Sequence, residues 1–123
     1  MIDVGDRVLG FISGGLSTSP SDAQILAVHC AVLPSRLANV VAAVAPGTPT
    51  TPTDCVLDVR KNGSSVWSNA ARRPTLPASS SARVFTTYQP DNAAVAPGDI
   101  VTLVCVQAAA KTNVALTVAL LEP

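Results

Sequence analysis

The sequence predicts an all-β protein: a single antiparallel β-sandwich of the jelly-roll or immunoglobulin-like kind, with about eight strands and an N-terminal arm. Val, Thr, Ser, Pro and Gly are abundant, whereas helix-favouring charged residues are scarce. Apolar runs of strand length alternate with turn residues at intervals of roughly ten residues. A length of 123 residues suits one domain with one core.

The N-terminal part divides into an arm and two apolar runs. Residues 1–22 are expected to form the arm with a first short strand, which "SGG" closes, and residues 23–123 the sandwich domain. The runs 23–33 and 36–45 have strand length, and their β-branched residues argue against helix although alanine is frequent. The simplest interpretation is two antiparallel strands joined at Pro34-Ser35.

The middle of the chain contains the clearest hairpin pattern. After a Pro/Thr loop at 46–53, residues 54–60 alternate, so that Asp54 and Asp58 share the face opposite the apolar side chains. We expect that face to be solvated. Asn62-Gly63 then predicts a tight turn, because both residues accept positive φ, and residues 64–67 are expected to return beside the first strand.

The C-terminal half is expected to contain three further strands. A long connection at 68–81 leads to a strand marked by Val84, Phe85 and Tyr88. Pro97-Gly98-Asp99 suits a β-turn before a strand at 100–107. The segment 114–121 alternates cleanly and is expected to close a last hairpin with it.

Few residues have the chemistry of an enzyme site. His29 is the single histidine and lies inside an apolar run, and no hydrolase, zinc-protease or phosphate-loop motif is present. Cys30, Cys55 and Cys105 are widely spaced in apolar runs, which favours buried free thiols over a disulfide or a zinc site. We therefore expect a non-enzymatic protein without a metal or cofactor.

Charge and hydropathy exclude several classes of partner. The formal net charge is zero, so no long-range field attracts a nucleic acid or an anionic membrane. No apolar run reaches the ~18 residues of a membrane helix. The N-terminus has two acidic residues where a secretory signal would have basic ones, so synthesis in a cytoplasm is expected.

Two loop features are candidates for recognition. Arg72 and Arg73 are adjacent and suit contact with carboxylates of a partner protein, although solvated loop arginines explain them equally well. Trp67 and Tyr88 are the aromatics available for a sugar-binding platform, and either can instead cap the end of the core. The sequence leaves both alternatives open.

Four stretches of the chain resemble, in their order, a known module. They are "VLDVRKNGSSVW", "RPTLPA", "APGDIVTLVCVQ" and "NVALTVALL". A β-sandwich module common in tailed-phage virion proteins is similar: a K-N-G hairpin, an R/K-P-T-I/L loop, an A-x-G-D turn and two closing strands. The resemblance covers residues 54–121, and residues 23–44 fit its leading strands more loosely. Acidic residues often follow the G-D turn in this module, and "VCVQAAA" replaces them here.

This resemblance implies a non-enzymatic virion component assembled in a host cytoplasm. The compact length favours a capsid decoration (cement) protein on the outer capsid surface, with the major capsid protein as its partner and a homotrimer as its assembly. The alternative is a tail or fibre module that binds a host receptor or glycan through Trp67 and Tyr88. For the decoration protein, the expected partner-binding residues are those of the arm and the arginine loop: Ile2, Val4, Arg7, Leu9, Phe11, Arg72 and Arg73.

Overall fold

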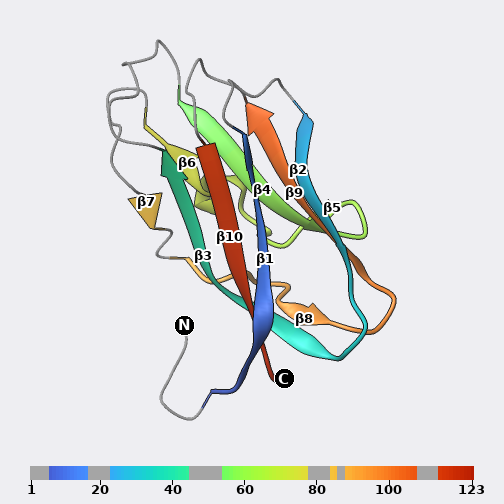
Figure 1. The fold of residues 1–123 in the computed structure, drawn as a ribbon. Coiled ribbons are helices and arrows are strands. Elements are labelled where there is room, and N and C mark those ends of the chain that lie inside the picture. Colours follow the sequence, from blue (N-terminus) through green and yellow to red (C-terminus); the bar gives the residue numbers. More distant parts are fainter. Residues whose placement is uncertain (1–5, 17–22, 45–53, 78–83, 86–87, 108–113) are drawn as a thin grey trace.

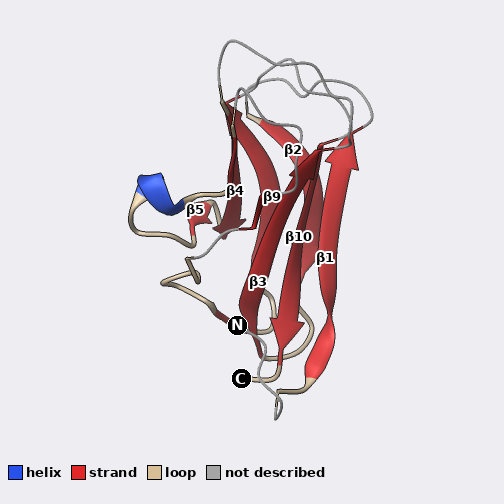
Figure 2. Ribbon diagram, turned by 90° about the vertical axis from the view of Figure 1, so that its left-hand side faces the viewer, coloured by secondary structure: helices blue, strands red, loops and turns tan. Residues whose placement is uncertain are grey.

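In the computed structural model, two five-stranded antiparallel sheets pack face to face as two layers (Figures 1 and 2). The structure describes residues 6–16, 23–44, 54–77, 84–85, 88–107 and 114–123. Strand-forming side chains dominate these residues, and the one helical segment among them is the short 3-10 turn η1 (Ala70–Arg72), capped by Asn69. The predicted all-β sandwich is thereby confirmed.

The first sheet has the order β1-β10-β3-β7, with β8 also paired to β3. Its long strands are paired over most of their length, from Leu16 opposite Val114 to Val8 opposite Leu121 in β1 and β10. The strands of this sheet are β1 (Val8–Leu16), β3 (Ser35–Val44), β7 (Val84–Phe85), β8 (Ala94–Val95) and β10 (Val114–Leu121).

The second sheet has the order β2-β9-β4-β5, with β6 also paired to β4. Here β9 is the central strand, with β2 on one side and β4 on the other. The strands of this sheet are β2 (Gln24–Cys30), β4 (Cys55–Lys61), β5 (Ser64–Ser65), β6 (Thr75–Leu76) and β9 (Ile100–Gln107).

The predicted hairpin at Asn62-Gly63 is confirmed. Both residues have positive φ, 52° and 88°, and β4 turns directly into β5, with Arg60 opposite Ser65. The amide of Val66 extends the ladder by donating to the carbonyl of Val59 at 3.0 Å. The local turn chemistry therefore determines this connection, as expected for an Asn-Gly pair.

The other two predicted hairpins are wrong. β2 and β3 lie in different sheets, since β2 pairs with β9 and β3 pairs with β10. β9 and β10 are likewise in different sheets. No residue from 31 to 35 has the positive φ of a tight hairpin turn. Each of these apolar strands instead crosses to the opposite sheet, where its inward side chains face the common core.

Leucine and valine side chains dominate the core between the sheets. Leu57, Leu103 and Leu116 are fully buried, and Trp67 is the aromatic side chain that joins them. The predicted inward set of β4, which is Cys55, Leu57 and Val59, is confirmed because all three are 0% exposed.

β1 is longer than the predicted first short strand. It continues through Gly14 and Gly15 to Leu16 and pairs with β10 throughout, so residues 8–16 belong to the sandwich and not to an arm beside it. A Cβ atom at Gly14 would lie 2.6 Å from the carbonyl oxygen of Leu26 in β2. "SGG" therefore does not close the strand: its glycine lets β1 approach β2 closely.

Two turns lock together at one end of the second sheet. Ala96 to Asp99 forms the predicted β-turn, with Gly98 at φ 91° and the amide of Asp99 donating to the carbonyl of Ala96. The side-chain amide of Asn62 donates to Asp99 Oδ1 at 3.0 Å, and Asn62 Oδ1 accepts from the amide of Ile100 at 2.9 Å. The Asn62-Gly63 turn is thus held against the start of β9.

Candidate protein-binding surface

The two sheets protect one pair of edges and leave the other pair open. On β3, the short strands β7 and β8 cover the outer edge, and the amide of Leu37 donates to the carbonyl of Ala93 at 2.9 Å. On β4, β5 and β6 do the same, and the amide of Leu57 donates to the carbonyl of Pro74 at 2.8 Å. β1 and β2 end their sheets without such a cover among the described residues.

The open edges lie together and carry no charged side chain. β1 and β2 approach most closely where Gly14 meets Leu26. Neither strand contains Asp, Glu, Lys or Arg. Natural sheet edges usually carry charges, prolines or bulges that prevent association. Here each edge has one register shift but no charge or proline.

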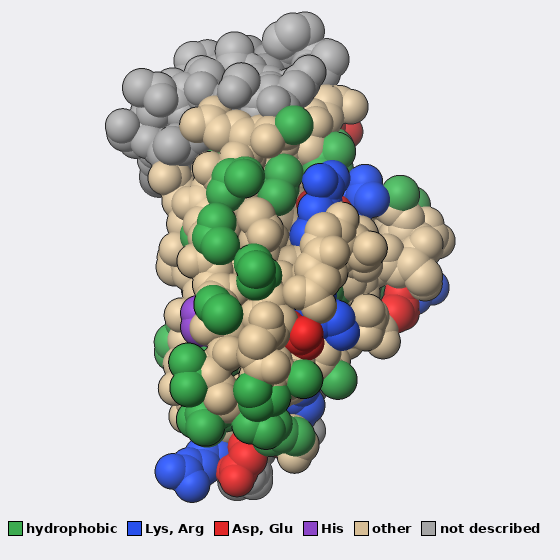
Figure 3. All heavy atoms as spheres, turned by 90° about the vertical axis from the view of Figure 1, so that its right-hand side faces the viewer, with side chains coloured by type: hydrophobic (Ala, Val, Ile, Leu, Met, Phe, Trp, Pro, Cys, Tyr) green, Lys and Arg blue, Asp and Glu red, His purple; other side chains and the backbone are tan. Residues whose placement is uncertain are grey.

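Exposed hydrophobic side chains concentrate on this side of the molecule. Of the nine large hydrophobic side chains that are exposed among the described residues, all except Tyr88 lie on β1, on β2, in the turn after β2 or at the start of β9. Figure 3 shows hydrophobic side chains running down this face, with charged groups beside them and at the lower end. We call this set the edge strip: Val8, Leu9, Phe11, Ile25, Val28, Val32, Leu33 and Ile100.

A shallow hollow interrupts the edge strip. It has a volume of about 150 Å³ and lies where residues of β1, β2 and β10 meet the turn after β2. Leu9 and Leu33 line both this hollow and an adjoining one that reaches Arg7 and Glu122. The hollow has the shape and chemistry to accept apolar side chains. Its lining residues are Leu9, His29, Val32, Leu33, Ser35 and Leu120.

Three of the predicted N-terminal binding residues belong to this region. Leu9 and Phe11 are 38% and 64% exposed and are part of the edge strip, and Arg7 is exposed at its lower end. Ile2 and Val4 lie outside the described residues. Arg7 and Glu122 are neighbours here, because the amide of Glu122 donates to the carbonyl of Arg7 at 2.9 Å.

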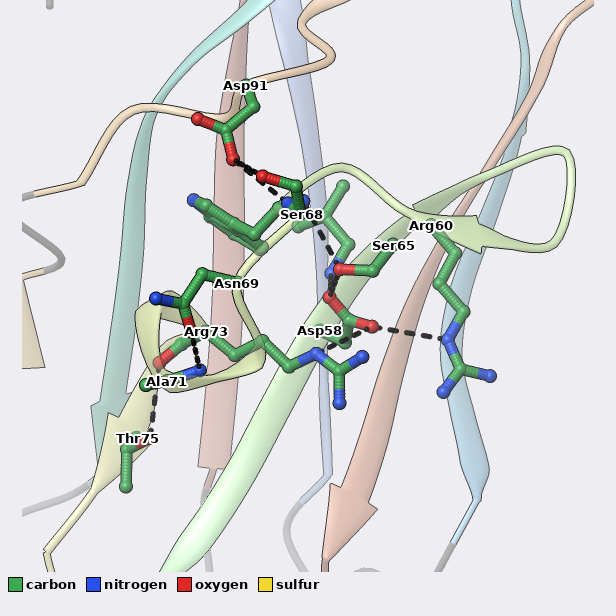
Figure 4. Close-up of polar contacts among 11 residues, drawn as sticks. Asp58, Arg60, Ser65, Ser68, Asn69, Ala71, Arg73, Thr75 and Asp91 are labelled. Atoms are coloured by element: carbon green, nitrogen blue, oxygen red, sulfur yellow. Dashed lines mark hydrogen bonds and ion pairs between the residues drawn. The ribbon is translucent and has the colours of Figure 1, made fainter.

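Arg72 and Arg73 have different environments. Arg73 points inward and its Nε lies 3.4 Å from Asp58 Oδ2, in an ion pair within the chain (Figure 4). Arg72 is exposed, and its guanidinium lies over the ring of Tyr88, 4.8 Å from the ring centroid. The structure thus separates the predicted pair: Arg72 remains available at the surface, whereas Arg73 is engaged with β4.

The expectation of a solvated face at Asp58 is wrong. Its carboxylate is 0% exposed because the segment that follows β5 folds over this part of β4. Oδ1 accepts from Ser65 Oγ at 2.8 Å and from the amide of Val59, and Oδ2 accepts from Arg60 Nε at 3.3 Å. Asp54, which shares its face, is exposed as expected. These partners compensate the burial of the carboxylate, so Asp58 has a structural role. We call Asp58 with Arg60, Ser65 and Arg73 the clasp.

The two aromatic candidates also differ. Trp67 is only 2% exposed, and its indole Nε1 donates to the carbonyl of Tyr88 at 3.3 Å, so it packs into the core and presents no platform. Tyr88 is 47% exposed beside Arg72. Of the proposed sugar-binding pair, the structure leaves one aromatic ring accessible.

Reactive and titratable groups are dispersed among the described residues. Cys55 and Cys105 are buried as expected, but Cys30 is exposed, because the outer face of β2 faces solvent. His29 is half-buried beside the hollow. Within the described part of the chain, no three His, Cys, Asp or Glu side chains are grouped to hold a metal ion, and no helix is long and apolar enough to cross a membrane.

Two aspartates in turns, Asp91 and the half-buried Asp99, have lowered pKa values. Hydrogen bonds from the side chain and backbone of Ser68 lower the pKa of Asp91, and the charge of Arg72 adds to the effect. The backbone of Ala96 and the side chain of Asn62 lower the pKa of Asp99 by donating to its carboxylate. Both groups stabilise turns, which accounts for their shifts without a catalytic role.

Most of the edge strip was not predicted from the sequence. The sequence pattern places Ile25, Val28, Val32, Leu33 and Ile100 in apolar strands and gives none of them a binding role. One pattern bears on them: the run "AQILAVHCAVL" is apolar at both odd and even positions, although β2 ends its sheet. An edge strand that is apolar on both faces indicates either a covering element or a partner.

Comparisons with protein-family models, with curated proteins and with solved structures found no match.

Proposed function

We propose that this chain is a non-enzymatic structural protein of a tailed-phage virion, a capsid decoration protein that binds the outer capsid surface and stabilises contacts between capsid subunits. The class rests on the order of turn motifs across residues 54–121. The major capsid protein is the proposed partner, the capsid surface the proposed location, and a homotrimer the proposed assembly.

The observation that carries the proposal is the edge strip on one side of the sandwich. Eight large hydrophobic side chains are exposed on this side of the sandwich. Exposed apolar patches on folded proteins mark sites of contact with other proteins. A capsid decoration protein has to bury surface against neighbouring proteins, which are capsid subunits and other copies of itself. It needs no catalytic site for this role. The dispersed arrangement of His29, Cys30 and the aspartates among the described residues is consistent with that role.

The tail-module alternative loses part of its basis. It depended on Trp67 and Tyr88 as a pair, and the burial of Trp67 leaves Tyr88 with Arg72 above its ring. A sugar ring would have to displace the guanidinium or stack on the opposite face of Tyr88. We therefore favour the capsid location.

Immunogold labelling of virus particles that carry this chain tests the proposal. Antibodies raised against the purified protein are expected to label the head uniformly. Label confined to the tail would support the tail-module alternative, and particles without label would reject both. Removal of the protein by mild chaotrope, followed by a heat challenge, tests the stabilising role: heads without it are expected to lose DNA at lower temperature than untreated heads.

A further inference from the structure

We infer that copies of this chain associate through the edge strip, which lies against a rotation axis and is buried by the same strip of the neighbouring copy. The number of copies, three, rests on the proposed function. The contact between copies rests on the surface properties of the edge strip.

The first argument is the lack of charge. β1 and β2 contain no Asp, Glu, Lys or Arg, and the large exposed side chains on them are apolar. Where a surface contacts the same surface of another copy, identical side chains lie near one another across the contact. A cluster of charges of one sign would therefore repel the same cluster on the neighbouring copy. An uncharged strip avoids this repulsion.

The second argument is the position of the charges that flank the strip. Arg7 and Glu122 lie side by side at its lower end, since the amide of Glu122 donates to the carbonyl of Arg7. Both are exposed. Around a rotation axis, the guanidinium of one copy can therefore face the carboxylate of the next. Among the described residues at this end, Asp6 and Arg36 are paired with each other within the chain, which leaves Arg7 and Glu122 as the charges that can be complementary between copies.

The third argument is the pattern of edge protection. Short strands and loops cover the outer edges of β3 and β4, whereas β1 and β2 each pair with one strand among the residues that the structure describes. Unprotected edges of this length associate readily. Protection on one side of the sandwich and not on the other is consistent with burial of the open side in the assembled state.

The fourth argument is size. A strand of nine residues is about 30 Å long, and two sheets about 10 Å apart with their outer side chains span about 20 Å, so this side of the sandwich covers roughly 600 Å². Stable interfaces bury about 800 Å² per partner. The edge strip with its margins is thus comparable with the surface that a specific contact needs, and its hollow can accept an apolar side chain of the neighbour.

Light scattering coupled to size-exclusion chromatography tests the contact on the purified full chain, from about 1 µM to about 300 µM. The natural chain is expected to form an oligomer that dissociates on dilution. Val28→Lys and Phe11→Lys each place a charge at a position that is 64% exposed in the single chain and buried in the assembly. Each is expected to raise the dissociation constant by about tenfold or more.

Ser64→Lys is the matched control, because it adds the same charge at an exposed position of β5, which β9 and β4 separate from β2. It is expected to change the dissociation constant less than about twofold. Emission from Trp67, which is buried in the core, verifies that each variant is folded. A monomeric natural chain over the whole range would overturn the inference, as would equal weakening by Ser64→Lys and Val28→Lys.

The exposed thiol of Cys30 gives a second measurement. Cys30 lies on the outer face of β2 beside Val28, so its reaction with a thiol reagent is expected to slow as the chain assembles. A rate independent of concentration, in a chain shown to assemble, would place the contact elsewhere. These results are separate from particle labelling: a monomer that labels heads retains the decoration role without this contact, and an oligomer absent from particles retains the contact without that role.

Discussion

Asp58 and Arg73 form an ion pair, with Arg73 Nε 3.4 Å from Asp58 Oδ2, that ties the segment after β5 to the outer face of β4. The Asp58 side chain is fully buried, whereas the Arg73 side chain is 24% exposed. Ser65 and Arg60 complete the clasp. The segment from β5 to β6 thereby becomes a fixed cover over one edge of the second sheet.

Asp58→Asn is expected to lower the free energy of unfolding by about 2–4 kcal/mol, because breaking a buried pair leaves cations without their counter-charge. The partial exposure of both arginines places the value below that of a fully buried pair. Urea unfolding monitored by Trp67 emission measures it. Ser64→Ala, which changes an exposed side chain of the neighbouring strand β5, is the control and is expected to stay within about 0.5 kcal/mol. Equal stabilities for the two variants would contradict the clasp.

Gly14→Ala is expected to destabilise the protein by about 1–3 kcal/mol, because the new Cβ would overlap the backbone carbonyl of Leu26. Gly10→Ala is the matched control on the same strand. A Cβ at Gly10 meets nothing within 4 Å, and its φ is not positive, so this change is expected to be neutral or slightly stabilising. Thermal unfolding of the two variants measures the difference. Similar midpoints would show that β1 and β2 do not approach closely at Gly14.

Asn62→Ala is expected to cost more than Gly63→Ala. Both positions have positive φ, which costs an alanine about 1–2 kcal/mol. A Cβ at Gly63 meets no atom within 4 Å, so the backbone penalty is its whole effect. Asn62→Ala additionally removes the hydrogen bonds to Asp99 and Ile100, worth about 1 kcal/mol each. Chemical denaturation ranks the two, and the reverse order would mean that the link between the turns contributes nothing.

Acid is expected to destabilise the protein through Asp91 and Asp99. Both have folded-state pKa values below the ordinary value of 3.8, so each contributes stability above that pH and loses it as the pH falls through its folded-state pKa. Urea midpoints measured from about pH 5 down to about pH 2.5 are expected to fall most steeply below about pH 4. In the Asp91→Asn/Asp99→Asn double variant this decline is expected to be shallower. An unchanged decline would assign the acid sensitivity to other carboxylates.

Native thiol titration is expected to detect one reactive cysteine in the dissociated chain. Cys30 is exposed, whereas Cys55 and Cys105 are 0% exposed in the core. Denaturant is expected to reveal all three. Cys30→Ser is the control, and its native form is expected to be unreactive. Rapid reaction of two or more thiols in the folded natural chain would contradict the described core.

Local sequence was sufficient where a few adjacent residues determine the backbone. Asn62 and Gly63 accept positive φ, and Pro97-Gly98 suits its turn, so both turns were predicted correctly. The alternation of β4 also gave the correct inward face. The all-β class followed from composition and from the spacing of apolar runs, because both reflect the propensity of single segments.

Strand pairing and burial required the tertiary structure. Nothing local distinguishes β2 paired with β3 from β2 paired with β9, since any apolar strand can bury its face against either sheet. The sequence determined that Asp58 points away from the core, and only the fold decided that Arg73 and the segment around it would cover that side. Likewise the sequence determined that β2 is apolar on both faces, whereas its position at a sheet edge beside β1 decided that Val28 faces solvent and is available to a neighbouring copy. The physical reason is the same throughout. The geometry of a turn is determined by residues adjacent in the sequence, whereas the burial of a side chain depends on which distant segments of the chain pack over it.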